Sequence, residues 1–144
     1  HTGKTISQRS RVTRALPPRS DAPTLSLAFQ RREDMWARID RRVDEMMAAG
    51  LAEEVRALLD SGVPVRCTAM QAIGYKEMAA ALRGGGDVCA AAEEIKLRSR
   101  QYAKRQLTWF RRTEGAKWLF WGPEPDFEAA CRTSTKYLEE FGLV

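Results

Sequence analysis

The feature that most constrains the fold of this chain is the stretch from Arg98 to Arg112, which is rich in Arg and Lys and contains no acidic residue. If the stretch is helical, its apolar side chains Tyr102, Ala103, Trp109 and Phe110 lie within one arc of the helix surface. Ile95, which precedes the stretch, falls on the same arc. Two cationic stripes flank the arc, one of Lys96, Arg100, Lys104 and Arg111, the other of Arg98, Arg105 and Arg112. The pattern predicts one long helix from the cap residue Asp87 to about Thr113, with Tyr102 and Trp109 in the core.

The missing acids also indicate what this helix binds. Most runs of charge form a solvated surface, and such surfaces usually mix both signs. Cations without acidic neighbours repel one another unless an anion neutralises them, and the fixed donor fork of arginine suits phosphate. The stretch therefore favours a nucleic-acid backbone, whose binding weakens steeply with salt. The same residues are also compatible with a scaffold role, in which the helix docks on an acidic protein partner.

The composition is that of one ordinary soluble domain, with 144 residues, 44% hydrophobic residues and a net charge of +5. The sequence has no apolar run of the length that spans a membrane and no secretory signal pattern, so we expect a cytoplasmic protein without a membrane partner. Cys67, Cys89 and Cys131 form no Cys-x-x-Cys pair, and His1 is the only histidine. We therefore predict no metal site and no histidine-based catalysis.

Residues 1–23 show no pattern of a packed element. Gly3-Lys4-Thr5 looks like the end of a phosphate loop, but that motif needs a preceding strand and an earlier glycine, and neither is present. Arginines and prolines follow as far as Pro23, a composition typical of an exposed connector. Because the chain begins with His1 and not with Met, we expect it to be processed, tagged or cut from a longer protein.

Two short apolar runs, residues 24–29 and 117–121, predict β-strands. The sequence between them has mostly helical patterns. Two strands alone make a marginal sheet. We therefore predict an α/β fold that is mostly helical, whose two strands belong to a sheet mostly absent from this chain.

Helical spacing of apolar residues predicts further helices over residues 31–49, 51–59, 67–82 and 127–141. Gly50 is expected to end the first of these helices in a left-handed cap. Thr68 is a candidate cap for the third, which Gly74 interrupts at a cost of about 1 kcal/mol relative to alanine.

The helix predicted over residues 31–49 carries Arg38 and Arg42 one turn apart. Asp34 and Glu45 lie three or four residues from them, within range for intrahelical ion pairs. From these residues alone, a solvated and salt-bridged face is favoured over a binding role.

Three motifs occur in the order and spacing of one known family. The first comprises Arg32, Arg38-Ile39, Arg42-Val43, Met47, Gly50-Leu51 and Glu54-Val55; the second is Ala72-Ile73-Gly74-Tyr75-Lys76-Glu77; the third runs from Arg100 to Phe110. Together they closely resemble the C-terminal half of bacterial tRNA dimethylallyltransferases, the tRNA isopentenyltransferase family. The resemblance covers about residues 1–121, and Thr2-Gly3-Lys4 is similar to a segment near the end of that family's helical insertion.

The resemblance implies the C-terminal portion of a P-loop NTPase-like α/β enzyme. Residues 1–23 would be the end of the helical insertion and a connector, and residues 24–144 the C-terminal part of the catalytic and tRNA-binding core. Such an enzyme transfers a dimethylallyl group from dimethylallyl diphosphate to the exocyclic amine of the adenosine on the 3′ side of the anticodon. Mg²⁺ assists the diphosphate and would be bound mainly by the N-terminal half, which this chain lacks. The resemblance further implies a monomer, and a chain that is inactive by itself.

The same resemblance suggests individual site residues. Arg38 matches an arginine implicated in catalysis, where a guanidinium group could stabilise charge on the leaving diphosphate. The positions that match segments in contact with the tRNA anticodon arm are Gln71, Ala72, Ile73, Gly74, Tyr75, Lys76, Arg100, Gln101, Lys104, Arg105 and Gln106. Gln71 replaces an arginine that is frequent in the family, and Gln106 faces the apolar arc, so a structural role is open for it. A self-contained, non-catalytic RNA-binding helical module is the alternative function.

Overall fold

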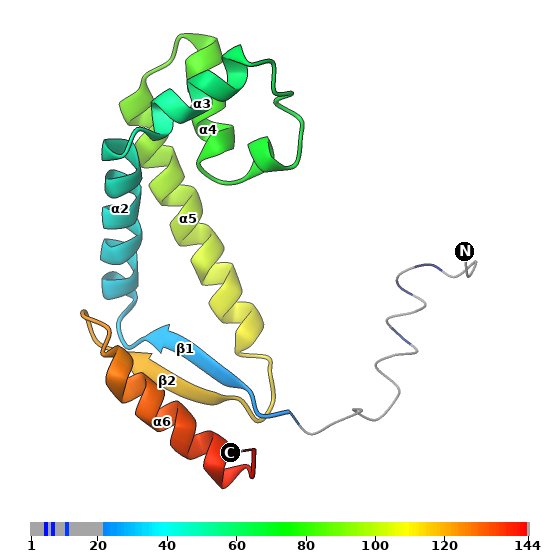
Figure 1. Ribbon diagram of the computed structural model, residues 1–144, viewed down its shortest axis with the longest axis vertical. Helices are drawn as coiled ribbons and strands as arrows, with labels where there is room; N and C mark the ends of the chain where they lie inside the picture. The colour runs from blue at the N-terminus through cyan, green and yellow to red at the C-terminus, as the bar shows by residue number, and fades with distance from the viewer. Residues whose placement is uncertain (1–4, 6, 8–10, 12–21, 144) are drawn as a thin grey trace.

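The computed structural model describes residues 5, 7, 11 and 22–143 (Figure 1). Its elements, in chain order, are β1 (Leu25–Phe29), α2 (Arg32–Ala48), α3 (Leu51–Asp60), the 3-10 turn η1 (Ala69–Gln71), α4 (Tyr75–Gly84), α5 (Val88–Phe110), β2 (Lys117–Trp121) and α6 (Phe127–Glu140). The predicted mixture of α-helices with two strands is confirmed. The expected connector over residues 1–23 lies almost entirely outside the described residues.

The two predicted strands pair with each other in a parallel sheet. Leu25 lies opposite Lys117 and Phe29 opposite Trp121, so the strands are in register over their whole length. Because side chains alternate along a strand, Leu27 and Phe120 point to opposite faces, and they are 52% and 57% exposed. Parallel strands are normally buried on both faces within a larger sheet. In the described part of the chain this sheet therefore has apolar surface uncovered on each face.

The hydrophobic core lies away from the sheet, where α3 and α4 pack against one end of α2 and α5 (Figure 1). Val55, Met70, Met78 and Ile95 are its largest fully buried side chains. The turn that brings α3 back onto α2 depends on Gly50, whose φ of 97° is in the left-handed region, as predicted. Among the described residues no helix is apolar over the length that crossing a membrane requires.

The basic stretch forms the second half of α5, as predicted, but the helix ends at Phe110 and not near Thr113, so Arg111 and Arg112 lie in the turn that follows it. Asp87 caps this helix by accepting a hydrogen bond from the backbone N–H of Cys89 at 2.7 Å. The prediction that Tyr102 and Trp109 lie in the core is wrong, because they are 48% and 65% exposed. Figure 1 shows that α3 and α4 lie beside the first half of α5 and that α2 and α5 diverge toward the strands, so the second half of α5 has fewer packed neighbours.

The segment around Gly74 differs from the predicted interrupted helix. Instead of one helix, η1 is followed by a break, and α4 begins directly after Gly74. The φ of Gly74 is 103°, and its N–H donates a hydrogen bond to the carboxylate of Glu77 at 2.9 Å. Thr68 precedes η1 without forming a side-chain cap. Gly74 thus turns the chain into α4, and the Glu77 carboxylate satisfies its donor.

Candidate functional site

The two segments predicted to contact tRNA meet in one pocket, which we call the loop pocket. It has a volume of about 500 Å³. The segment from η1 to α4 and the middle of α5 line it, with Gln71, Ile73, Lys76, Glu77 and Ala80 from the first and Glu94, Arg98, Gln101 and Arg105 from the second. Amides, cations and a hydrophobic side chain from distant parts of the sequence therefore border one space, with two carboxylates among them.

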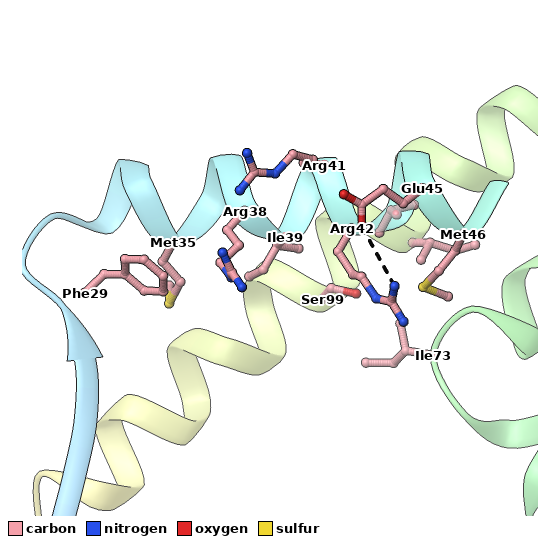
Figure 2. A pocket seen from close by; sticks show the side chains of 12 residues that line it. Phe29, Met35, Arg38, Ile39, Arg41, Arg42, Glu45, Met46, Ile73 and Ser99 are labelled. Atoms are coloured by element: carbon pink, nitrogen blue, oxygen red, sulfur yellow. Dashed lines mark ion pairs between the residues drawn. The ribbon is translucent and has the colours of Figure 1, made fainter. Parts of the chain in front are cut away.

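A second pocket, the arginine pocket, lies between α2 and α5 and contains Arg38 (Figure 2). Its volume is about 550 Å³. The wall is mostly apolar, formed by Phe29, Met35, Ile39, Val43, Met46, Ile73 and Ile95, and the polar residues are Arg38, Arg41, Arg42, Glu45 and Ser99. Ile73 borders both this pocket and the loop pocket, so the two spaces are adjacent.

The three arginines of this pocket point in different directions. Figure 2 shows the guanidinium groups of Arg38 and Arg42 on the side of α2 that faces α5, and that of Arg41 on the other side. Arg42 pairs with Glu45, as expected for neighbours on one helix, at 3.8 Å. The expected pairing of Arg38 with Asp34 does not occur, and none of the ion pairs between described residues includes Arg38. Arg38 thus presents to a mostly apolar pocket a cation that has no counter-ion among the described residues.

Two further pockets follow the second half of α5, and Lys104 and Thr108 border both. The strand-end pocket lies at the carboxyl end of β1, where Lys104 of α5 and Arg111, directly after this helix, border the same space as Arg31, Arg32 and Glu33. The Trp109 pocket comprises Gln101, Lys104, Arg105, Thr108, Trp109 and Arg112. Sequence reasoning did not select Thr108, Trp109, Arg111 or Arg112 as site residues. These four residues belong to the acid-free stretch from Arg98 to Arg112, and this composition was the sequence signal that could have identified them.

The charges of α5 divide into a paired and an unpaired half. Lys96 contacts Asp44 at 2.7 Å and Glu93 at 2.8 Å, Arg98 contacts Glu94 at 2.6 Å, and Arg100 contacts Asp40 at 3.0 Å. The hydrogen bond to Asp44, followed by that to Glu93, raises the pKa of the Lys96 amine above its ordinary value. The expectation that only an external anion could neutralise the stretch is therefore wrong for its first turn, because α2 and the start of α5 supply carboxylates. Within the described residues, Lys104, Arg105, Arg111 and Arg112 form no ion pair.

Tyr75 is directed toward α3. Its hydroxyl donates a hydrogen bond to a carboxylate oxygen of Glu54 at 2.6 Å. That hydrogen bond, together with burial, raises the pKa of the Tyr75 phenol. Tyr75 borders neither the loop pocket nor the arginine pocket, and its polar group is already occupied.

The other predicted site residues occupy varied positions. The side-chain amide of Gln71 borders the loop pocket and donates to the backbone carbonyl of Val65 at 2.8 Å. Gly74 is buried. Ala72 and Gln106 are exposed and border none of the four pockets described above. Gln106 does not pack in the core, contrary to what its place on the apolar arc suggested.

The described residues do not offer a site for a divalent cation. No group of three or more His, Cys, Asp and Glu side chains lies together in that part of the chain. Mg²⁺ prefers an octahedral set of oxygen ligands, several of them waters. The described side chains do not fit such a cation.

The chain is similar in sequence to known proteins. The family model for IPP transferase matches residues 1–113. The tRNA dimethylallyltransferase of Natranaerobius thermophilus is 41% identical over 122 residues, which are 83% of this chain and 35% of the relative. That of Acetivibrio thermocellus is 36% identical over 143 residues, 99% of this chain and 45% of the relative. The chain spans less than half the length of these curated relatives.

Solved structures show the same similarity. The full-length tRNA isopentenylpyrophosphate transferase of Bacillus halodurans superposes with a TM-score of 0.77 at 32% identity, covering 92% of this chain and 43% of that one. The tRNA delta(2)-isopentenylpyrophosphate transferase of Staphylococcus epidermidis gives a TM-score of 0.75 at 34% identity, covering 96% and 45%.

Proposed function

Because the chain belongs to the IPP transferase family, we propose that it is the tRNA-facing part of an enzyme that prenylates tRNA. The complete enzyme transfers a dimethylallyl group from dimethylallyl diphosphate to the exocyclic amine of the adenosine on the 3′ side of the anticodon. The observation that carries this proposal is the meeting of two distant segments, Gln71–Lys76 and Arg98–Arg105, in the loop pocket next to the arginine pocket.

The loop pocket suits an RNA loop. Unstacked bases are recognised through hydrogen bonds to their edges and through stacking, and the backbone through cations. Gln101 and Gln71 supply amides, and Lys76 and Arg105 supply cations around that pocket. We assign Lys104 and Arg100 to the same surface, with Arg100 held by Asp40. Ala72, Gly74 and Tyr75 would then shape the loop, and Gln106 would contact RNA from the exposed side of α5.

The arginine pocket suits the reacting groups. An adenine amine within a stacked loop is out of reach, so the base must be flipped into a pocket. The amine nitrogen then bonds to the first carbon of the dimethylallyl group as the bond from that carbon to the diphosphate oxygen breaks, and the amine loses a proton to a base. Negative charge grows on the departing diphosphate. The guanidinium group of Arg38, which has no ion-pair partner among the described residues, would stabilise that charge.

The remainder of the enzyme would complete the fold. We propose that residues 24–144 are the C-terminal part of a P-loop NTPase-like core, preceded by the end of a helical insertion and a connector over residues 1–23. Further strands would then extend the β1–β2 sheet, and other elements of the remainder would pack on its faces and cover Leu27 and Phe120, which are exposed in this chain. The diphosphate loop, the base and any Mg²⁺ would belong to that remainder, in a monomeric cytoplasmic enzyme.

Product analysis tests this proposal. The complete enzyme is incubated with dimethylallyl diphosphate and a tRNA that has adenosine next to the anticodon, and the digested nucleosides are analysed by mass spectrometry. We expect a dimethylallyl adenosine at that position, and no product from the isolated chain. If the complete enzyme binds RNA but forms no product, the transferase function is rejected, and the non-catalytic RNA-binding helical module is the function that remains.

A further inference from the structure

We propose that Arg42 binds a backbone phosphate of the RNA whose base enters the arginine pocket, and that Glu45 holds the Arg42 guanidinium group until the RNA arrives. This inference rests on the proposed function and adds to it a specific phosphate-binding residue and its competitor. It concerns the boundary between the two pockets, a place distinct from Arg38 and the departing diphosphate.

The position of Arg42 separates it from the neighbouring arginines. It follows Arg38 by one helical turn and emerges on the same side of α2 (Figure 2). Its guanidinium group extends toward Ile73, the residue shared by the arginine pocket and the loop pocket. A base that passes from the loop pocket into the arginine pocket therefore carries its backbone past Arg42. Arg38 lies nearer to Met35, at the end of the pocket close to β1.

The ion pair of Arg42 is of a kind that is readily exchanged. The Nη1 atom of Arg42 and the Oε2 atom of Glu45 are 3.8 Å apart, and the side chains are 71% and 57% exposed. This distance exceeds that of a direct hydrogen bond, and exposed ion pairs contribute little. A phosphate group offers several oxygens to the arginine fork and can accept two hydrogen bonds at once. Phosphate should therefore displace Glu45 and leave it facing solvent.

The chain provides a matched control for the charge. Arg41 precedes Arg42 directly and also borders the arginine pocket, but its guanidinium group lies on the side of α2 away from α5 (Figure 2). Replacing either arginine removes one positive charge from the same helix. A difference between the two variants therefore reports the direction of the side chain and not the net charge.

RNA affinity of the complete enzyme, measured without prenyl donor, tests the inference. We expect Arg42→Ala to weaken binding of an anticodon stem-loop about tenfold and to reduce the slope of log affinity against log salt by about 0.7, the value for one contact to single-stranded RNA. Arg42→Lys should fall between wild type and Arg42→Ala. Arg41→Ala should change affinity by no more than about twofold, and the KM for dimethylallyl diphosphate should stay unchanged in Arg42→Ala.

Glu45→Gln should act in the opposite direction. Removing the competitor should tighten RNA binding about threefold, and this gain should disappear when Arg42→Ala is also present. Unlike simple repulsion between Glu45 and RNA, this mechanism requires Arg42. Thermal melting of each variant checks that the fold is retained.

Three results would overturn the inference. The first is an Arg42→Ala effect no larger than that of Arg41→Ala. The second is a Glu45→Gln gain that persists without Arg42. The third is a raised KM for dimethylallyl diphosphate with unchanged RNA affinity, which would assign the bound phosphate to the prenyl donor. Failure of the wild-type enzyme to prenylate tRNA is a separate result, since it rejects the proposed function while the RNA affinities remain measurable.

Discussion

Asp40 on α2 accepts a hydrogen bond from Arg100 on α5, with Oδ2 and Nη1 3.0 Å apart. About one turn away on each helix, Asp44 and Lys96 form a second contact at 2.7 Å. The other oxygen of Asp40, Oδ1, is buried and has no hydrogen-bond partner among the described residues. These two contacts join α2 to α5 beside the arginine pocket, which Val43 and Ser99 of the same two helices border.

A double-mutant cycle measures the first contact. Asp40→Ala and Arg100→Ala should each lower the free energy of unfolding by about 1–2 kcal/mol, because each leaves a partly buried charge without its partner. The double variant should lose about 1 kcal/mol less than the sum of the two. Urea denaturation gives these values. The same cycle on Glu128 and Arg132, a pair on α6 with 89% and 69% exposed side chains, should give at most about 0.5 kcal/mol of coupling. Additivity at Asp40 and Arg100 would show that their contact does not hold the helices together.

The contacts of Lys96 predict how stability changes at alkaline pH. Hydrogen bonds to Asp44 and Glu93 raise the pKa of the Lys96 amine, so its pKa in the folded protein exceeds the value of about 10.4 expected in the unfolded chain. The resulting stability is fully present below the unfolded pKa and is lost as pH rises through the folded pKa. Denaturation midpoints of wild type and Lys96→Met should therefore differ by a constant amount from pH 7 to 9 and converge above about pH 10.4. A constant difference up to pH 12 would contradict this account.

The backbone at Gly74 should resist substitution. Gly74 has a φ of 103°, and an added Cβ would meet only the Met46 Cε atom at 3.8 Å, an ordinary contact. Gly74→Ala should therefore destabilise through the backbone, by about 1–2 kcal/mol. Gly84, in the last turn of α4, has no such φ and open space around its Cβ position, so Gly84→Ala should be neutral or stabilise by up to about 1 kcal/mol. Thermal melting compares the two, and equal effects would contradict the assigned strain.

Substitution of Tyr75 tests whether this residue has a structural role or contacts RNA. Tyr75→Phe removes the hydroxyl that donates to Glu54, and we expect a loss of about 0.5–1 kcal/mol in stability. RNA affinity of the complete enzyme should not change. Lys76, the next residue along the chain, borders the loop pocket. Lys76→Ala should weaken RNA binding about threefold or more. A loss of RNA affinity in Tyr75→Phe at unchanged stability would assign the hydroxyl to the RNA.

Local pattern was sufficient to predict most elements of this fold, but not the break at Gly74 between η1 and α4. The bounds of β2, the cap at Asp87 and the left-handed Gly50 follow from short-range rules, because each depends only on neighbouring residues. The resemblance also gave five of the nine residues that line the loop pocket, Gln71, Ile73, Lys76, Gln101 and Arg105. That these residues contact RNA stays a prediction.

Burial along α5 could not be predicted in the same way. Periodicity identifies which side chains share a helix face, but what covers that face depends on other elements. Ile95 is buried within the helical core, whereas Trp109 on the same arc is 65% exposed, and the residues that border the pocket around it come only from α5 and the turn after it. The partners of Arg100 and Lys96 were likewise missed, since Asp40 and Asp44 lie on another helix, far away in the sequence.

The most direct test of the central claim is the single-turnover rate of prenyl transfer by the complete enzyme with Arg38→Ala, measured beside its tRNA affinity. If Arg38 stabilises the departing diphosphate, the rate should fall about a hundredfold or more, as for the loss of one transition-state donor, while tRNA affinity changes by less than about threefold. Arg41→Ala, whose guanidinium group lies on the other side of α2, should retain a rate close to wild type. A normal rate with weakened tRNA binding in Arg38→Ala would contradict the account and place Arg38 among the RNA-binding residues.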